Sequence, residues 1–373
     1  MTQKLLLVGA GGAFGFRLAH RLAASVPCEL LVAGRSTARC GKVVAALHEQ
    51  HPQALVSPVV LDRDTVTAAR LRELGVFIVI DAAGPFQGGA PHLAQAAIAA
   101  GCHFIDLADA RDYAARFPEL DAAAQEANVL AVTGASSTPA LSNAALDVLT
   151  AGWQAVEIVT VAIAPGNRAP RGLAVTQAIL SYAGRPVRLL EAGRWRTRPG
   201  WSLLQRRDLP GLGKRWLSRC ETPDLDVIPA RFPAVRTVHF LAGLELGLLH
   251  VGLWACTLLV RAGLVSSLVP AARFFVAGAE LFVSFGSDRG GMLVEAHGIG
   301  ADGRRVRAAW SLVAEAGDGP NIPVLPALAL IRRLLSGVET RRGARICAGL
   351  LSLDEIAAEF SAFRITTAQT ETG

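Results

Sequence analysis

Residues 4–24 read KLLLVGAGGAFGFRLAHRLAA, and this stretch decides the fold of the first part of the chain. The apolar run at residues 5–8 predicts a buried strand, and the apolar spacing from Phe16 onward predicts a helix. Gly9, Gly12 and Gly15 lie between the predicted strand and the start of the predicted helix. Glycine there permits an unusual backbone angle, close approach of a diphosphate and tight contact between helix and strand. The G-x-x-G-x-x-G spacing between strand and helix therefore predicts a dinucleotide site.

The size and composition of the chain predict a folded protein of two domains. Of its residues, 51% are hydrophobic and 18% are charged, as in a folded protein. Its length of 373 residues exceeds what one hydrophobic core usually holds. We expect a nucleotide-binding domain at residues 1–152, a substrate and dimerisation domain at residues 153–318, and residues 319–373 packing back on the first domain. The first strand leaves no room for a secretory leader, so we expect a cytoplasmic protein.

The six cysteines predict neither a metal site nor a disulfide framework. They are scattered, with no C-x-x-C pair and no histidine at metal-ligand spacing. We therefore expect buried free thiols, in keeping with a reducing compartment, and no metal cofactor.

The segment after the second predicted strand, residues 29–33, indicates which dinucleotide is bound. In NAD-binding domains an acidic residue about 20 positions beyond the glycine turn accepts a hydrogen bond from the ribose. This chain has Arg35 and Ser36 instead. A cation and a hydroxyl suit a 2′-phosphate, so NADP is the expected cofactor, and Arg39 and Lys42 add positive charge one helical turn further on.

Strand and helix signals continue to alternate through the first domain. Apolar runs at residues 55–61, 76–80, 103–107 and 129–132 predict four more strands with helices between them. Fully apolar strands of this kind belong to a parallel sheet that is covered on both faces. The expected fold class is therefore α/β, with an N-terminal doubly wound Rossmann sheet and a second α+β domain.

Ligands of such sheets bind at the carboxyl ends of the strands. Residues 81–86, DAAGPF, follow a predicted strand, and their small side chains allow close approach of a nicotinamide ribose. The expected cofactor-binding residues are Gly9, Gly11, Gly12, Ala13, Phe14, Gly15, Arg35, Ser36, Asp62, Ala82, Ala83, Gly84, Pro85 and Phe86.

Four segments together resemble the saccharopine dehydrogenase-like NADP-binding oxidoreductases. They are GAGGAFG at residues 9–15, AGR at residues 33–35, DAAGPFQGGAPHLAQAAIAAGCHFIDLAD at residues 81–109 and TGASSTPALSNA at residues 133–144. The resemblance implies a Rossmann domain followed by an α/β domain that holds the substrate and often a dimer contact. It further implies an NADP-dependent reductase that acts on CH–NH groups, that is, at a C–N centre of a small acidic substrate, and a homodimer.

Candidate catalytic residues follow the predicted strand at residues 103–107. Asp106, Asp109 and Tyr113 come to the ligand edge there, and one of the two aspartates is expected to face the site while the other caps the next helix. His103 is expected to be structural. Neither Tyr113 nor Tyr182 has a lysine four residues on, which excludes the short-chain reductase pattern.

Substrate-binding residues are expected on both domains. Ser136 follows the predicted strand at residues 129–132, and Arg168 and Arg171 are candidates for holding a substrate carboxylate from the second domain.

The segment at residues 185–219 is strongly basic. It contains ten basic residues, two acids, and the tryptophans Trp195, Trp201 and Trp216. Three interpretations stay open: a loop-rich lid or domain edge with solvated or paired arginines, an anion site for a carboxylated or phosphorylated substrate, and peripheral membrane contact. No nucleic-acid recognition motif accompanies the charge, so nucleic acid is not an expected partner.

Residues 244–260 are apolar but too few to cross a bilayer, which takes about 20 residues. We expect a buried or interfacial helix there, then a second helix at residues 268–283. This leaves two alternative functions: a non-catalytic NADP-binding protein that docks on a membrane or partner, and a lipid-directed reductase.

The remaining signals of the second half predict a second sheet and a loose tail. Residues 156–164 alternate like a strand, and residues 291–298 and 304–314 flank a D-G turn, as in a hairpin. An apolar helix is expected to begin near Pro323 or Pro326, and the polar residues after Arg364 are expected to be loose.

Overall fold

The computed structural model describes residues 2–170 and 172–372, so Arg171 lies outside the described residues. The chain divides into two compact units. The first runs up to Ala140 and includes Asn321–Leu351, and the second consists of Leu141–Pro320 and the residues from Ser352 onward. The boundary lies earlier than the expected residue 152 because helix α7 (Ser142–Leu149) packs on strands of the second unit.

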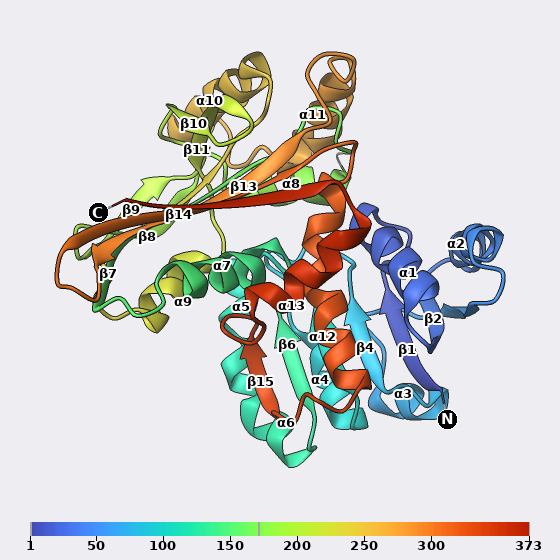
Figure 1. The fold of residues 1–373 in the computed structure, drawn as a ribbon. Helices are drawn as coiled ribbons and strands as arrows, with labels where there is room; N and C mark the ends of the chain where they lie inside the picture. The colour runs from blue at the N-terminus through green and yellow to red at the C-terminus, as the bar shows by residue number, and fades with distance from the viewer. Residues whose placement is uncertain (1, 171, 373) are drawn as a thin grey trace. The chain divides into compact units, whose positions relative to one another are not determined.

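The first unit is built on a parallel sheet of seven strands among the described residues, in the order β15-β6-β5-β4-β1-β2-β3 (Figure 1). Every pair of neighbours is parallel. The strands are β1 (Gln3–Val8), β2 (Cys28–Gly34), β3 (Leu55–Val60), β4 (Ile78–Asp81), β5 (His103–Asp106), β6 (Leu130–Thr133) and β15 (Gly343–Ile346). The predicted α/β class with an N-terminal parallel sheet is confirmed.

Helices cover both faces of this sheet. Helix α1 (Ala13–Ser25) contacts α2 (Thr37–Gln50) and α12 (Leu325–Leu335), whereas α4 (His92–Ala100) contacts α3 (Ala68–Leu74) and α6 (Asp121–Glu126). Within β1, Leu6 and Val8 belong to the core that includes α3 and α4, and Leu5 and Leu7 point the other way. This arrangement is doubly wound.

Two details of the first unit differ from the expectation. The helix expected to follow β5 is broken into α5 (Arg111–Ala114), a 3-10 turn at Phe117–Leu120 and α6, with Pro118 inside the turn. Strand β15 is contributed by the late segment that also carries α12, and it pairs with β6.

The second unit contains a mixed sheet in the order β10-β11-β12-β7-β13-β14-β16. Its strands are β7 (Ala155–Ala164), β10 (Gln205–Leu209), β11 (Gly213–Arg219), β12 (Thr237–Ala242), β13 (Gly290–Ile299), β14 (Arg305–Ala314) and β16 (Ile365–Thr372). Strand β12 runs parallel to β7, and the other pairs are antiparallel. The predicted strand at residues 156–164 and the predicted D-G hairpin are confirmed.

Several helices accompany this sheet. Helix α7 packs on β13 and β14, and α9 (Asp224–Arg231) packs on β12. Helix α8 (Leu173–Tyr182) contacts α11 (Ala272–Glu280), and α13 (Leu353–Ala357) contacts α7.

The prediction of a loose C-terminal tail is wrong. Residues 365–372 form β16, which pairs along its whole length with β14. Its sequence, ITTAQTET, is rich in threonine, which favours strands without adding an apolar signal. An edge strand that exposes polar side chains carries little hydrophobic pattern, and the tail was therefore misread.

Of the three interpretations of the basic segment at residues 185–219, the loop-rich lid or domain edge is wrong about the loops, whereas its paired arginines are found. The segment forms two antiparallel hairpins, β8 (Pro186–Glu191) with β9 (Arg194–Pro199), and β10 with β11. Five of its arginines are paired with acids: Arg188 with Asp226, Arg198 and Arg219 with Glu191, Arg207 with Glu295, and Arg215 with Glu245. Half of the local positive charge is thus engaged within the second unit.

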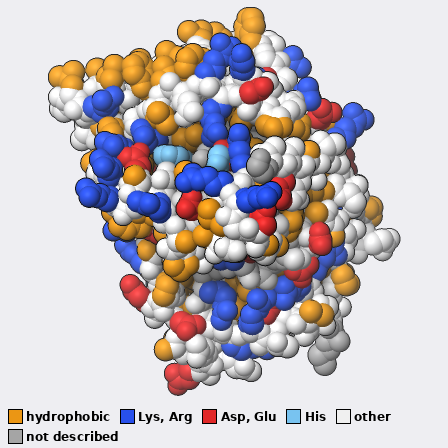
Figure 2. Space-filling model, turned by 60° about the vertical axis from the view of Figure 1, so that its left-hand side comes forward, with side chains coloured by type: hydrophobic (Ala, Val, Ile, Leu, Met, Phe, Trp, Pro, Cys, Tyr) orange, Lys and Arg blue, Asp and Glu red, His pale blue; other side chains and the backbone are white. Residues whose placement is uncertain are grey.

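Helix α10 (Gly247–Arg261) corresponds to the apolar stretch at residues 244–260, and α11 follows it. Within the described residues, no helix has both the length and the apolar character needed to cross a membrane. Figure 2 shows hydrophobic side chains gathered at the upper end of the molecule, where Figure 1 places α10 and α11.

Candidate functional site

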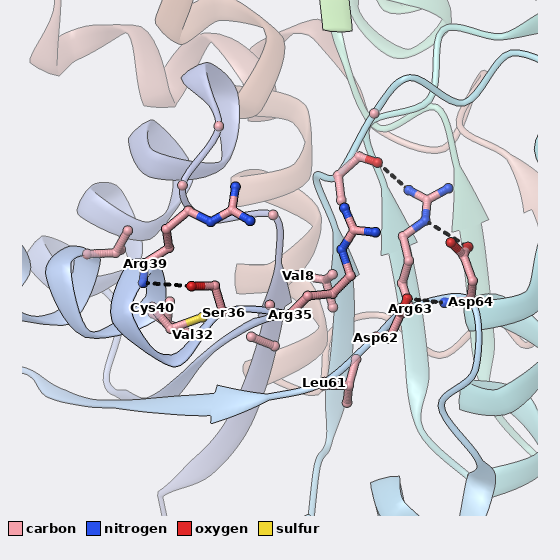
Figure 3. A pocket seen from close by; sticks show the side chains of 18 of the residues that line it. Val8, Val32, Arg35, Ser36, Arg39, Cys40, Leu61, Asp62, Arg63 and Asp64 are labelled. Carbon is pink, nitrogen blue, oxygen red and sulfur yellow. Dashed lines mark hydrogen bonds and ion pairs between the residues drawn. The ribbon is translucent and has the colours of Figure 1, made fainter.

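A cavity of about 520 Å³ opens at the carboxyl ends of the strands of the first unit (Figure 3). It is bordered by the glycine turn after β1, the end of β2 with the start of α2, the loop after β3 and the loop after β4. The lining residues are Val8, Gly9, Gly11, Gly12, Val32, Ala33, Gly34, Arg35, Ser36, Arg39, Cys40, Val43, Leu61, Asp62, Arg63, Asp64, Ala83, Gly84 and Pro85.

The glycines shape one wall of this cavity. Gly9 has φ +87°, and a Cβ there would lie 2.7 Å from the backbone of Ala82 and Ala83. A Cβ on Gly15 would overlap the carbonyl oxygen of Gly9, so α1 can approach the end of β1 only with glycine at this position. Helix α1 begins after Gly12 without a side-chain cap, which leaves the N–H groups of its first turn free to meet an anion.

A cationic corner lies opposite, at the turn from β2 into α2. Ser36 is the N-cap of α2, and its Oγ accepts a hydrogen bond from the Arg39 backbone N–H at 3.4 Å. The Ser36 hydroxyl hydrogen remains available to a ligand oxygen. Figure 3 shows the side chains of Arg35 and Arg39 at this corner. Two guanidinium groups, a hydroxyl and a helix N-terminus form a donor set that suits a phosphate.

Arg63, which the sequence analysis missed, crosses the cavity between the loops after β3 and β4. Its Nη1 forms an ion pair with Asp81 at 3.2 Å and donates to the carbonyl of Ala83, and its Nε donates to Asp64 at 3.4 Å. The guanidinium also lies 5.3 Å from the centroid of the Phe86 ring. Arg63 therefore fixes the loop after β4. Its place directly after Asp62, at the carboxyl end of β3, was the available signal.

The buried Asp81 carboxylate also holds the loop after β4 in place. Its Oδ1 accepts from the Ala83 N–H at 2.9 Å, in addition to the ion pair with Arg63. Burial raises the pKa of Asp81, and the neighbouring Arg63 opposes that rise. The ion pair thus offsets part of the cost of burying this charge.

The cavity includes nine of the expected cofactor residues. They are Gly9, Gly11, Gly12, Arg35, Ser36, Asp62, Ala83, Gly84 and Pro85. Ala13, Phe14 and Gly15 lie in the first turn of α1, behind the glycines. Ala82 and Phe86 flank the lining part of the loop after β4, and the buried Phe86 ring packs 5.3 Å from the ring of Tyr113.

Asp106 is fully buried at the end of β5 and joins two neighbouring loops. Its Oδ1 accepts from the Ala108 N–H at 2.9 Å, the Gly134 N–H at 2.8 Å and the Thr133 Oγ at 2.9 Å. Oδ2 has no hydrogen-bond partner among the described residues. Burial raises the pKa of Asp106 to about 7, although the hydrogen bonds oppose the rise. The geometry is that of a positioning residue, and Asp106 does not line the cavity.

Asp109 and Tyr113 differ in their access to solvent. Asp109 is exposed, and its Oδ1 accepts from Gln87 Nε2 at 3.1 Å, next to the loop that lines the cavity. Tyr113 is buried, and burial together with the Asp106 carboxylate raises its pKa far above the usual value. Of the three expected catalytic residues, Asp109 alone is exposed.

His103 is buried and links two strands, as a structural histidine would. Its Nδ1 accepts a hydrogen bond from the Leu130 N–H at 2.9 Å, and burial lowers its pKa to about 4. The ring is therefore neutral at pH 7.

The expected substrate residues do not line the cavity. Ser136 is buried in the first unit, after β6. Arg168 belongs to the second unit, where its side chain is exposed and donates to the carbonyl of Ser284 at 3.4 Å. Arg171 lies outside the described residues.

The cavity fits the predicted cofactor in shape and donor chemistry. The glycines of the turn after β1 leave open the space beside the α1 N-terminus that a Cβ would occupy. The arginines at the end of β2 lie at the position where Rossmann domains bind the 2′-phosphate of NADP. Gly9, Gly11 and Gly12 would hold the diphosphate, Arg35, Ser36 and Arg39 the 2′-phosphate, and Ala83, Gly84 and Pro85 the nicotinamide half.

The comparisons with known proteins concern the domain family and the fold. Residues 5–132 match the family model of the saccharopine dehydrogenase NADP binding domain, which supports the predicted resemblance. A search of the curated proteins found no match.

Among solved structures, apo saccharopine dehydrogenase (L-Glu forming) from Saccharomyces cerevisiae is similar with a TM-score of 0.67. The two share 13% sequence identity over 99% of this chain and 100% of the other, so the likeness shows a shared fold. A short chain dehydrogenase from Mycobacterium smegmatis aligns over 35% of this chain and 75% of its own, with 16% identity and a TM-score of 0.30.

The close approach of α1 to β1 predicts that Gly15→Ala destabilises the first unit. The added methyl group would force α1 away from the Gly9 carbonyl, and overpacking of this kind costs about 1–3 kcal/mol. Gly11→Ala is the matched control, because its nearest heavy atom would be Val43 Cγ2 at 4.0 Å. We expect thermal unfolding to show a lower midpoint for Gly15→Ala alone. Equal midpoints for the two variants would contradict this account of the turn.

The buried Asp106 predicts a pH-dependent stability difference between the wild type and Asp106→Asn. The folded-state pKa of about 7 lies above the ordinary value of 3.8, so ionisation disfavours the folded state. The stability of the wild type therefore declines as pH rises from about 4 to about 7. Asparagine keeps the accepting oxygen and cannot ionise. As pH rises from about 4 to about 7, we expect the unfolding free energy of Asp106→Asn minus that of the wild type to increase by up to about 4 kcal/mol. A difference that stays constant with pH would refute the raised pKa.

Proposed function

We propose that this chain is an NADP-dependent oxidoreductase that transfers a hydride at a C–N centre, between an imine and the corresponding amine, of a small substrate with an acidic or amino-acid group. The match of residues 5–132 to the model of the saccharopine dehydrogenase NADP binding domain supports this proposal. The observation that carries the cofactor part is the cationic corner of Arg35, Ser36 and Arg39 at the end of β2. The proposed C–N chemistry draws its support from the family of the matched domain.

The residues around the cavity have separable tasks in this proposal. Bound NADPH would supply the hydride. The glycine turn and the α1 N-terminus would hold the diphosphate, and the cationic corner would select NADPH over NADH. Arg63 and Asp81 would hold the loop after β4 in place through the ion pair at 3.2 Å, so that the reacting end of the cofactor meets a fixed backbone.

Asp109 is the proposed proton-transferring residue. Reduction of an imine requires a proton at nitrogen as well as a hydride at carbon, and a carboxyl group close to the site can transfer it. Asp109 is exposed and bonded to Gln87, whereas the Asp106 carboxylate is occupied with the backbone of two loops.

Arg35→Ala tests the cofactor assignment by calorimetric titration with NADPH and with NADH. We expect the wild type to bind NADPH more tightly, and the variant to lose roughly 10- to 100-fold in NADPH affinity, because a charge-assisted bond to phosphate contributes about 1.5–3 kcal/mol. NADH affinity should change little. Arg116→Ala, an exposed arginine of the same unit outside the cavity, is the control. Equal affinity of the wild type for both nucleotides would overturn the assignment of NADP.

Asp109→Asn tests the reaction class with an assay of NADPH oxidation on mixtures of α-keto acids and amino acids, which form imines. We expect turnover by the wild type and a decrease in kcat of about 100-fold or more in the variant, with NADPH affinity unchanged. Glu119→Gln, an exposed carboxylate of the same unit, should keep full activity. A protein that binds NADPH tightly and oxidises it with none of these imines would refute the C–N proposal and leave the cofactor assignment standing.

A further inference from the structure

Helices α10 and α11 expose apolar side chains where surface helices normally expose polar ones. Nine of the seventeen exposed large hydrophobic residues of the described chain fall within residues 248–285. They are Leu248, Leu258, Leu259, Leu264, Val265, Phe274, Leu281, Val283 and Phe285. Isolated exposed hydrophobic residues are common, but a concentration of this kind marks an interaction site.

The helical spacing of α10 shows that its outer face is uniformly apolar. Leu248, Gly252, Ala255 and Leu259 follow one another at intervals of four, three and four residues, and all four are exposed. The polar side chains of His250 and Thr257 are buried on the opposite side. His250 Nε2 lies 2.9 Å from Ser218 Oγ, which satisfies it inside the unit. The exposed face of the helix is therefore apolar where an ordinary surface helix is polar, and its buried side combines His250 and Thr257 with Leu253.

The same pattern occurs on α11 and the turn after it. Phe274, Ala277 and Leu281 lie on one face at intervals of three and four residues, and Phe274 and Leu281 are 81% and 78% exposed. Phe285 follows at 62% exposure, and Leu264, between the two helices, is 72% exposed. We call the outer faces of α10 and α11, with the segment between them, the α10/α11 face.

The charges at the margin of this face are mostly positive. Arg261 ends α10, Arg273 lies in the first turn of α11, and both are exposed. Arg168 adjoins the turn after α11 through its bond to the Ser284 carbonyl. Glu280 is the one exposed acid between residues 244 and 285, since Glu245 is held by Arg215 and Ser287. Figure 2 shows Lys and Arg side chains next to the hydrophobic upper end.

We propose that the α10/α11 face docks on an anionic lipid bilayer, with its apolar side chains in the acyl boundary and its arginines at the headgroups. A surface that combines exposed aliphatic and aromatic residues with basic ones is complementary to such a bilayer. A symmetric contact with a second copy would bring the same arginines toward one another, where like charges repel. Charge therefore favours lipid over self-association.

Flotation of the full chain with vesicles tests this proposal. The vesicles are phosphatidylcholine alone or phosphatidylcholine mixed with phosphatidylglycerol, at low and high salt. We expect binding to the anionic vesicles that weakens with salt. Arg261→Ala with Arg273→Ala should lower the partition coefficient roughly 30-fold, at about 1 kcal/mol for each cation. Phe274→Glu with Leu281→Glu should lower it at least tenfold, because two apolar side chains leave the membrane.

Val338→Glu is the matched control, since Val338 is a 66% exposed hydrophobic residue of the first unit. It should bind vesicles like the wild type. NADPH titration of every variant reports whether the nucleotide-binding unit is intact, and far-ultraviolet circular dichroism reports whether the helices remain. Vesicle binding is measured without nucleotide, so its failure is distinct from a failure of the proposed oxidoreductase function.

Three results would overturn the docking proposal. The first is no flotation of the wild type with anionic vesicles at low salt. The second is equal flotation of the wild type and the Phe274→Glu, Leu281→Glu variant. The third is a wild-type dimer, measured by sedimentation, that this variant converts to a monomer while vesicle binding stays unchanged, because the face would then belong to a second copy of the chain.

Discussion

The contact between Gly15 and the carbonyl of Gly9 is the constraint on which the nucleotide-binding unit depends. Without a Cβ at Gly15, α1 can begin close to the end of β1, and its uncapped N-terminus directly follows Gly11 and Gly12, which line the cavity. The left-handed backbone of Gly9 brings the turn equally close to Ala82 and Ala83 in the loop after β4. Two strand ends and one helix start are thereby drawn together, and the space left between them is the cavity. Shape, rather than any charged side chain, defines this wall.

Two buried aspartates at the ends of adjacent strands differ in the partners of their carboxylates. Asp81 ends β4 and is paired with Arg63, which also stacks on Phe86, so the pair fixes the loop that borders the cavity. Asp106 ends β5 with three hydrogen bonds on one oxygen and none on the other among the described residues. No cation of the described residues acts on Asp106 to offset its burial, and its pKa rises to about 7. Burial raises the pKa of both carboxyl groups, and at Asp81 the neighbouring Arg63 guanidinium opposes that rise.

The sequence predicted those parts of the fold that bury a continuous apolar pattern. Strands β1, β2 and β4 each contain at least three consecutive apolar residues and were found where expected, as was the glycine turn. Strand β15 has four residues, and its partner β6 lies more than two hundred positions away, so local pattern carried no information about it. Strand β16 was missed because its threonines pair along an exposed edge. Arg63 was missed because it acts through contacts with Asp81 and Phe86, which are remote in sequence.

The basic hairpins of the second unit show why a count of charges does not locate an anion site. Ten basic residues against two acids between residues 185 and 219 suggest an uncompensated patch. Three of the four acids that neutralise its arginines, Asp226, Glu245 and Glu295, come from outside the segment. Glu295 is nearly buried and pairs with Arg207 and Arg307 at once. Through Glu295 of β13, Arg207 of β10 and Arg307 of β14 hold strands of one sheet together. Their charge is then no longer free to attract a ligand. Exposed charge matters instead at the margin of the α10/α11 face, where Arg261 and Arg273 border apolar side chains that the second unit does not bury. A few unpaired cations beside an uncovered apolar face favour an anionic surface more strongly than a larger number already matched with carboxylates.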